Sequence, residues 1–400
     1  MKKIYRLEGK IQNYAWGGRS FIPELLGRNS RDKPVAEYWL GAHDNSPSVL
    51  VDNEQTLNDF IREAPLDRLG HQTATMFGRL PYLFKVLDVK NMLSIQVHPT
   101  KKEAEMGFAA ENEKGINLQA ANRNYKDDNH KPEIMVALSD FWLLHGFKPK
   151  NELADTLKDT PELKYLMPVV EKLGYKGLYE KVMLHSKQQI EAVLKPLKDR
   201  ILPRFHQNEL SKNSADFWAA KAFEYYGFDP GIFSIYIFNI VKLAAGQAIF
   251  QNAGVPHAYL EGQNMELMAN SDNVLRGGLT PKYVNTKELL KIVKFEATTP
   301  DIIEGELQPD QMEVKYFSPA PDFELSKISI KKGEQYQGYS ESCEIILNMN
   351  GLVDMLEHNH DSLRIEKGQS VLITADCHYS ITSKSNSVMY KAKTATSNSF

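Results

Sequence analysis

The stretch LPYLFKVLDVKNMLSIQVHPT, residues 80–100, decides how the rest of the chain is interpreted. In its second half, apolar side chains alternate with those of Ser94, Gln96 and His98. Because successive side chains of a strand point to opposite faces, this alternation predicts a strand with a polar face and an apolar back. Pro99 cannot donate to a ladder and is expected to end the strand. A buried amide and imidazole need partners, so the polar face either forms part of a site or lies in solvent.

Length, composition and charge predict a soluble protein of two or three domains. The chain has 400 residues, which is more than one core usually holds. It is 42% hydrophobic with a formal net charge of −3, so no basic field suggests nucleic acid or a membrane as partner. The two cysteines, Cys343 and Cys377, lie far apart, and no apolar run approaches a membrane span or a signal peptide. We expect a cytoplasmic monomer without a disulfide framework or a thiolate zinc site.

The pattern of apolar residues changes twice along the chain. Short aromatic-rich strands dominate residues 1–149, with helices expected at Gln55–Glu63 and Lys101–Gln119. Residues 150–227 instead carry apolar side chains at i, i+3, i+4 and i+7, the spacing of packed helices. From Gly231 the sequence is again typical of strands.

The C-terminal part is predicted to be a second β unit. One short helix is expected at Thr286–Val293, with Asn285 or Thr286 as its N-cap. After it, short strands separated by Gly and Asn turns are typical of a jelly-roll barrel. We therefore predict a mainly β protein with a helical insertion. Its domains would be a discontinuous one of residues 1–149 and 228–307, a helical one of residues 150–227, and a C-terminal one of residues 308–400.

Two further stretches carry polar side chains that an apolar core would not choose. In NHKPEIMVAL, Lys131 and Glu133 share one strand face, with His130 at its edge. A charged pair beside apolar side chains is costly to bury unless it is paired or bound to a metal. In GVPHAYLEG, a glycine–proline turn brings His257 and Tyr259 to one face of another strand. For His130, a contact with a loop backbone is the simpler interpretation.

A third stretch concentrates charge, with Glu266, Asp272, Asn273, Arg276 and Lys282 inside GQNMELMANSDNVLRGGLTPKYVN. Its cations, together with Lys131, could receive a phosphate or stabilise an enolate. The alternative for residues 272–276 is a solvated salt-bridge loop. The remaining isolated histidines are expected to be structural, namely His43, His71, His145, His185 and His206.

Two imidazoles, one carboxylate and one amide form a mixed ligand set: Gln96, His98, Glu133 and His257. Such ligands suit zinc or another first-row divalent ion. A neutral amide leaves the ion more positive than a further carboxylate would, which makes it a better Lewis acid.

The C-terminal half contains a similar set, with His358, His360, Glu366 and His378. However, His358–Asp361 is typical of a hairpin turn, where polar residues are common. We therefore expect one metal ion per chain.

The chain resembles the type I mannose-6-phosphate isomerase (phosphomannose isomerase) family. The resemblance rests on NYAWGG, LPYLFKVLDVKNMLSIQVHP, YKDDNHKPE, GVPHAYLEG and ELMANSDNVLRGGLTPK, in that order, between about residues 10 and 290. It implies a bicupin, in which two jelly-roll barrels accompany a helical insertion, with one Zn²⁺. It also implies interconversion of mannose 6-phosphate and fructose 6-phosphate through a cis-enediol.

The resemblance also implies roles for individual residues. Its metal ligands fall on Gln96, His98, Glu133 and His257, and its catalytic arginine falls on Arg276. Its other pocket positions fall on Trp16, Ser94, Lys131, Tyr259, Glu266, Asp272 and Lys282. The first cupin motif departs from its usual compact spacing, because Glu133 lies 35 residues after His98. For proton transfer, Glu266 and Lys131 are the leading candidates, followed by His130 and Asp272.

Two other functions fit part of this pattern. An iron-dependent cupin oxygenase needs two histidines and a carboxylate with open coordination positions, which His98, Glu133 and His257 alone would satisfy. Gln96 and the cationic cluster distinguish the isomerase from it. A non-catalytic bicupin would bind the sugar phosphate without converting it.

Overall fold

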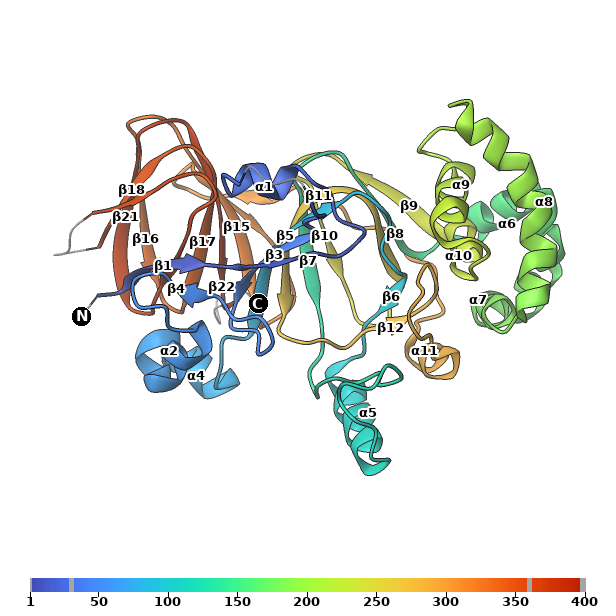
Figure 1. Cartoon of the computed structure of the whole chain (residues 1–400), viewed down its shortest axis with the longest axis horizontal. Helices are drawn as coiled ribbons and strands as arrows, with labels where there is room; N and C mark the ends of the chain where they lie inside the picture. The colour runs from blue at the N-terminus through green and yellow to red at the C-terminus, as the bar shows by residue number, and fades with distance from the viewer. Residues whose placement is uncertain (1, 29–31, 358–361, 396–400) are drawn as a thin grey trace.

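The computed structural model describes residues 2–28, 32–357 and 362–395. Figure 1 shows the C-terminal strands at one end, a second set of strands in the middle and a block of helices at the other end. Among the described residues, no helix combines the length and apolar character that crossing a membrane requires.

The central β unit is built around one long strand, β11 (His257–Ala269), which pairs with four others. Every pairing in this ten-stranded sheet is antiparallel. The other strands of the unit are β2 (Lys10–Gln12), β3 (Glu37–Gly41), β5 (Tyr82–Val89), β6 (Gln96–Val97), β7 (Glu133–Ala137), β8 (Phe141–Phe147), β9 (Phe238–Leu243), β10 (Ala248–Gln251) and β12 (Leu275–Arg276).

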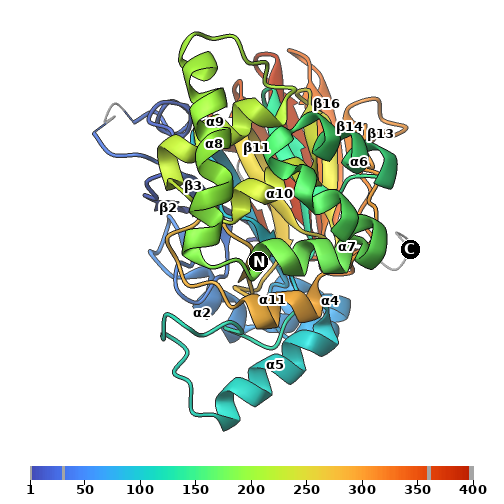
Figure 2. The same cartoon turned by 90° about the vertical axis from the view of Figure 1, so that its right-hand side faces the viewer.

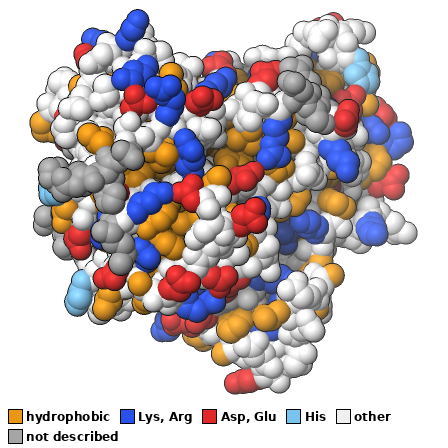
Figure 3. All heavy atoms as spheres, turned by 60° about the vertical axis from the view of Figure 1, so that its left-hand side comes forward, with side chains coloured by type: hydrophobic (Ala, Val, Ile, Leu, Met, Phe, Trp, Pro, Cys, Tyr) orange, Lys and Arg blue, Asp and Glu red, His pale blue; other side chains and the backbone are white. Residues whose placement is uncertain are grey.

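The C-terminal β unit consists of an eight-stranded and a four-stranded sheet. The larger sheet contains β13 (Glu306–Leu307), β14 (Glu313–Tyr316), β15 (Glu324–Ile330), β22 (Ser387–Lys393), β17 (Glu344–Asn350), β20 (Ser370–Ile373), β1 (Ile4–Glu8) and β4 (Val49–Leu50). The smaller sheet contains β16 (Gln335–Ser340), β21 (Cys377–Ser383), β18 (Val353–Glu357) and β19 (Leu363–Ile365). Hydrophobic side chains lie among charged ones of both signs on this side of the molecule (Figure 3).

The two β units share one apolar core. The first strand of the chain, β1, pairs with β20, with Ile4 opposite Ile373. Tyr82 of the central unit packs in the same buried cluster as Phe323 and Leu372 of the C-terminal unit. The phenol of Tyr82 also donates to the carbonyl oxygens of two C-terminal residues at 3.0 Å. This shared burial holds the two units together.

The helical block covers one end of the central unit (Figure 2). It contains α6 (Lys150–Asp159), a 3₁₀ turn (Pro161–Leu166), α7 (Met167–Met183), α8 (Lys187–His206), α9 (Ala215–Tyr226) and α10 (Gly231–Ile237). Its core continues into the strands, because Trp218 of the block shares a buried cluster with Ile95 and Val97 beside the metal-ligand candidates.

The remaining helices are short, except for α5 (Lys101–Glu113), which stands away from the sheets in both cartoon views (Figure 1, Figure 2). Thr100 and Glu103 form a capping box at its start. The other helices are α1 (Phe21–Leu25), α2 (Leu57–Glu63), α3 (Pro65–Leu69), α4 (His71–Phe77) and α11 (Thr286–Ile292).

Most of the expected elements are observed. The helical insertion, the C-terminal strands and the helices α2, α5 and α11 are confirmed, and Asn285 caps α11 through its side chain. The strand expected over Leu93–Pro99 is shorter, because only Gln96 and Val97 join the ladder. Residues 358–361, where a hairpin turn is predicted, lie outside the described residues.

One expected element is wrong. Gly231–Ile237 forms the helix α10 rather than a strand, and the strand β9 begins only at Phe238. All seven residues of α10 are buried. A short apolar run buried on every side has no periodicity that separates a strand from a helix.

Candidate metal centre and active site

Three of the predicted metal ligands meet inside the central unit. The donor atoms of His98, Glu133 and His257 lie within 4.8 Å of one another, and all three residues are buried. Nε2 of His98 is 3.5 Å from one carboxylate oxygen of Glu133, and Nε2 of His257 is 3.4 Å from the other. The carboxylate therefore sits between two imidazole nitrogens that point toward it.

Hydrogen bonds fix which ring nitrogen of each histidine is free to bind a metal. Nδ1 of His98 donates to the carbonyl of Asn273 at 2.9 Å, and Nδ1 of His257 donates to the carbonyl of Val255 at 3.0 Å. Because a carbonyl only accepts, both protons sit on Nδ1 and both Nε2 lone pairs face Glu133. This is the tautomer that a metal-binding histidine needs.

Burial and neighbouring charges keep His98 and Glu133 in their metal-binding charge states. Burial lowers the pKa of His98 to about 4, so its ring is neutral near pH 7. Nε2 of His98 is buried without a hydrogen-bond partner among the described residues. Burial opposes the charge of Glu133, but the ammonium of Lys131 at 2.8 Å, together with His98, holds the pKa of this carboxyl well below its usual range. An orphaned imidazole nitrogen beside a carboxylate fits a divalent cation such as zinc.

The sheet register brings the fourth predicted ligand to the same place. Gln96 pairs with His257 across β6 and β11, and it lines a cavity together with His257 and Glu133. The other cavity-lining residues are Glu37, Lys85, Leu87, Leu93, Lys131, Ala258, Tyr259 and Glu266. The sequence-predicted residues Lys131, Tyr259 and Glu266 thus lie with the metal ligands.

A buried ion pair forms the wall of this cavity. Nζ of Lys85 is 3.0 Å from Glu266, and the phenol of Tyr259 donates to the other oxygen of Glu266 at 2.8 Å. Glu37 lies 3.9 Å from the same ammonium. Burial raises the pKa of Glu266. Burial disfavours charged Lys85, but Glu266 and Glu37 outweigh it and raise the pKa of Lys85.

The sequence reasoning missed Lys85 and Glu37. A signal for Lys85 was present, because it is one of only two charged residues in the strand YLFKVLDV, all eight residues of which are buried. A lysine in such a strand needs a buried partner. Nothing near Glu37 distinguished it from other strand residues.

The predicted cations Arg276 and Lys282 are not among the cavity-lining residues. Arg276 faces Gln96 across β12 and β6. Its guanidinium makes no hydrogen bond or ion pair with any residue in the described ranges. Lys282 lies at the surface, where partial desolvation and the charge of Arg276 lower its pKa. Two neighbouring cations without a carboxylate partner are suited to a bound anion.

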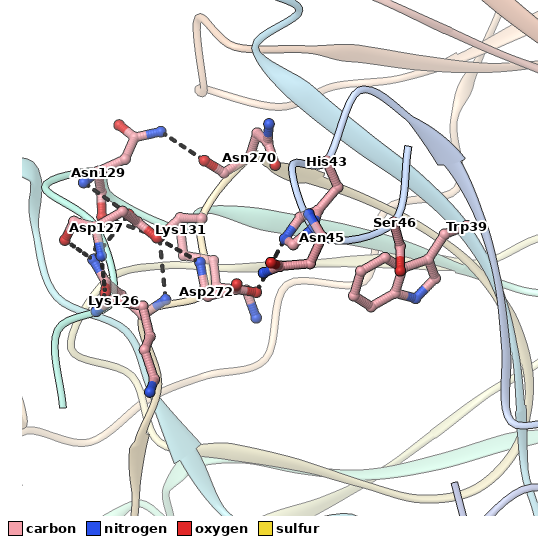
Figure 4. A network of polar contacts seen from close by, with 12 residues as sticks. Trp39, His43, Asn45, Ser46, Lys126, Asp127, Asn129, Lys131, Asn270 and Asp272 are labelled. Carbon is pink, nitrogen blue, oxygen red and sulfur yellow. Dashed lines mark hydrogen bonds and ion pairs between the residues drawn. The ribbon is translucent and has the colours of Figure 1, made fainter. Parts of the chain in front are cut away.

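The other predicted residues have mixed positions. Trp16 packs against the apolar cluster that contains Tyr259, and Ser94 is half-buried on the segment that leads to Gln96. Asp272 is not among the cavity-lining residues, and its carboxylate contacts Nε2 of His43 at 3.2 Å (Figure 4). His130 is also outside the lining, and its Nε2 lies 2.9 Å from the carboxylate of Asp322.

Two histidines that we expected to be structural lie next to the site. His43 holds Asp272, as described above. His145 stands directly opposite His257 in the pairing of β8 with β11, and neither of its ring nitrogens has a hydrogen-bond partner among the described residues. No local sequence signal marked either residue, because the contact of His43 joins two loops and the position of His145 arises from strand pairing.

Comparisons with known proteins agree with this geometry. The family model "Phosphomannose isomerase type I, catalytic domain" matches residues 4–150. The mannose-6-phosphate isomerase of Salmonella typhimurium is 36% identical over 383 residues, covering 93% of this chain and 95% of that protein. The human mannose-6-phosphate isomerase is 32% identical and covers 88% of both chains.

Solved structures agree over the whole fold. A crystal structure of the Salmonella typhimurium isomerase bound to its substrate, fructose 6-phosphate, and to zinc has a TM-score of 0.89 at 32% identity. The match covers 99% of this chain and 100% of that one. This likeness confirms the predicted fold class, a mainly β protein of cupin type with a helical insertion. The chain belongs to the type I phosphomannose isomerase family.

Proposed function

We propose that this chain is a zinc-dependent mannose-6-phosphate isomerase that interconverts mannose 6-phosphate and fructose 6-phosphate. The observation that carries the proposal is the buried cluster of His98, Glu133 and His257, which opens onto a cavity walled by Lys85 and Glu266. A metal-binding set and a carboxyl group of raised pKa in one cavity supply what an aldose–ketose isomerase needs.

We assign one zinc ion per chain to Gln96, His98, Glu133 and His257. When bound, zinc would supply positive charge that polarises the sugar oxygens and stabilises an enediolate. Lys131 pairs with Glu133 at 2.8 Å. Because Lys131 also lines the cavity, we propose that its ammonium holds and moves a proton between O1 and O2 of the sugar.

Glu266 is our candidate for the group that transfers the carbon-bound proton. In the forward direction, its carboxylate would take the proton from C2 while the electrons of that C–H bond form the C1–C2 double bond. The C1 carbonyl oxygen would gain a proton, which gives the cis-enediol. Loss of the O2 proton and return of the proton from Glu266 to C1 would then give the ketose. Burial raises the pKa of Glu266, which makes its carboxylate a stronger base than an exposed one.

The phosphate is assigned to Arg276 and Lys282. Neither side chain has a carboxylate partner within the described part of the chain. Partial desolvation and the charge of Arg276 lower the pKa of Lys282. Trp16, Ser94 and Tyr259 would contact the sugar. Because Asp272 contacts His43 and His130 contacts Asp322, we place these two residues outside the group that touches substrate.

The test is a coupled assay for fructose 6-phosphate formed from mannose 6-phosphate. Turnover should be lost with a chelator, restored by zinc, and unchanged without oxygen. Binding of mannose 6-phosphate without any fructose 6-phosphate would overturn the isomerase in favour of a binding protein. Turnover that requires oxygen would favour the oxygenase.

We also propose a monomer in the cytoplasm. Cys343 and Cys377 are both free and buried, which fits a reducing compartment. Light scattering after size-exclusion chromatography would give the mass, and a value near twice 45.5 kDa would overturn the monomer.

A further inference from the structure

A buried asparagine joins three parts of the site that are far apart in the sequence. Asn273 is fully buried and lies between β11 and β12. Its carbonyl accepts the Nδ1 proton of His98 at 2.9 Å, the hydrogen bond that leaves Nε2 free for a metal. It precedes Arg276 by three residues and the start of β12 by two.

The side chain of Asn273 forms hydrogen bonds with a second segment, residues 126–129. Its Oδ1 accepts from the backbone N–H groups of Lys126 at 2.7 Å and Asp127 at 3.3 Å. Its Nδ2 donates to the carbonyls of Asp127 at 2.8 Å and Asn129 at 2.9 Å. This segment leads directly into Lys131 and Glu133. The one side chain thus uses all of its donors and acceptors on the approach to the metal-binding strand.

Asp127 adds hydrogen bonds in the other direction, from this segment to residues 271–273. Its carboxylate accepts from the Ser271 hydroxyl at 2.7 Å, from the Asp272 backbone N–H at 2.8 Å and from Nδ2 of Asn273 at 3.1 Å. Figure 4 shows Asp127 and Asn129 facing Asn270 and Asp272 across the gap between the two segments. Residues 126–129 and 270–273 are therefore tied together by side chains from both sides.

We propose that Asn273 is a positioning residue, which sets His98, the segment bearing Lys131 and Glu133, and Arg276 in one geometry for metal binding and turnover. The proposal rests on the proposed function only in taking zinc as the metal and the sugar phosphate as substrate. Asn273 acts through the residues that it holds and is not among the cavity-lining residues. A buried polar group that is satisfied on all sides fixes its neighbours because any shift leaves donors unpaired.

A matched asparagine exists in the C-terminal unit. Asn348 is buried to the same degree, and its Nδ2 donates to the carbonyls of Gly351 at 3.0 Å and Ile365 at 3.3 Å. It ties a turn to a neighbouring strand without touching a site residue. The variants Asn273→Ala and Asn348→Ala therefore remove a similar side chain with and without a link to the metal centre.

The experiment compares both variants with the wild type by zinc affinity in chelator competition, by kcat and KM at saturating zinc, and by thermal unfolding without zinc. For Asn273→Ala we expect zinc affinity to fall about 10- to 100-fold, the range seen when groups behind metal ligands are removed. We also expect kcat to fall more than KM changes. For Asn348→Ala we expect a lower Tm with zinc affinity and kcat within about threefold of wild type.

A folded Asn273→Ala protein with zinc affinity and kcat within threefold of wild type would overturn the proposal. If Asn273→Ala does not unfold cooperatively, Asp127→Asn decides, because it weakens the same network from the other segment. It should reduce zinc affinity in the same direction, and unchanged affinity would overturn the proposal. A wild type that binds zinc but forms no fructose 6-phosphate would refute the proposed function, while the zinc affinities would still test Asn273.

Discussion

Each β unit buries a lysine and a tyrosine against one glutamate, and the group in the central unit lines the cavity beside the metal-ligand cluster. The group in the central unit, here called the first-unit triad, is Lys85, Tyr259 and Glu266. The group in the C-terminal unit, the second-unit triad, is Glu313, Tyr336 and Lys391. Lysine and glutamate are 3.0 Å apart in the first triad and 2.9 Å apart in the second. In both, the phenol donates to the glutamate at 2.8 Å.

The surroundings of the two triads differ. In the second-unit triad, Nζ of Lys391 also lies 2.9 Å from the phenol of Tyr336, and Glu313 accepts from Ser326 at 2.6 Å. The first-unit triad lies instead beside the metal-ligand cluster, where Nε2 of His98 has no hydrogen-bond partner among the described residues. Buried charge alone therefore does not mark a functional site. A site is marked where buried polar atoms are left unpaired beside an opening.

The largest expected effect is a loss of catalytic activity in a variant of the central unit but not in the matched variant of the C-terminal unit. Glu133→Gln keeps the volume of the side chain but removes the carboxylate between the two histidines. Because a metal supplies several kcal/mol of charge stabilisation, kcat/KM should fall on the order of 10³-fold. Glu313→Gln, the matched change in the second-unit triad, should leave kcat/KM within about threefold. Equal losses in the two variants would remove the distinction.

The next largest expected effect is on the free energy of unfolding, and it distinguishes the two triads. Lys391→Met leaves Glu313 buried without its cation, which should lower the free energy of unfolding by about 3–5 kcal/mol, measured with urea. Its kcat should match the wild type after correction for the folded fraction. Lys85→Met should instead lower kcat on the order of 10²-fold, because Glu266 loses the group that orients it. A Lys85→Met enzyme of normal kcat would show that the first-unit triad is structural as well.

The second-unit triad should also govern stability in acid. Burial opposes its charge, but Lys391 and the hydrogen bonds from Ser326, Lys391 and Tyr336 lower the pKa of Glu313 to about 2. A carboxyl with a lowered folded-state pKa stabilises the fold above its unfolded pKa, and this contribution is lost as the pH falls toward 2. Of the stability lost between about pH 5 and 2, about 3 kcal/mol should come from Glu313. Glu313→Gln should flatten the pH dependence of urea unfolding, and an unchanged slope would contradict this assignment.

The smallest effect concerns a residue at the boundary between the units. His130→Ala removes a ring that contacts Asp322 rather than the cavity. Both kcat and KM should stay within about threefold of wild type. A fall in kcat of about 100-fold, the size expected of a proton-transfer group, would return His130 to the site.

Sequence reasoning predicted the members of the buried cluster His98, Glu133 and His257 better than it predicted their surroundings. Gln96, His98 and His257 stand in local patterns, an alternating strand and a glycine–proline turn, which constrain side-chain direction without knowledge of the fold. The contact of Lys85 with Glu266 depends instead on the register of β5 with β11, and the link between β1 and β20 joins opposite ends of the chain. Register and long-range pairing arise from the packing of the whole sheet.

The most direct test of the distinction between the two units is the zinc content of the dialysed protein. We expect about one zinc per chain in the wild type and in Glu313→Gln, and less than about 0.1 in Glu133→Gln. Zinc retained at the wild-type level by Glu133→Gln would contradict the site at His98, Glu133 and His257. About two zinc ions in the wild type would contradict a single site.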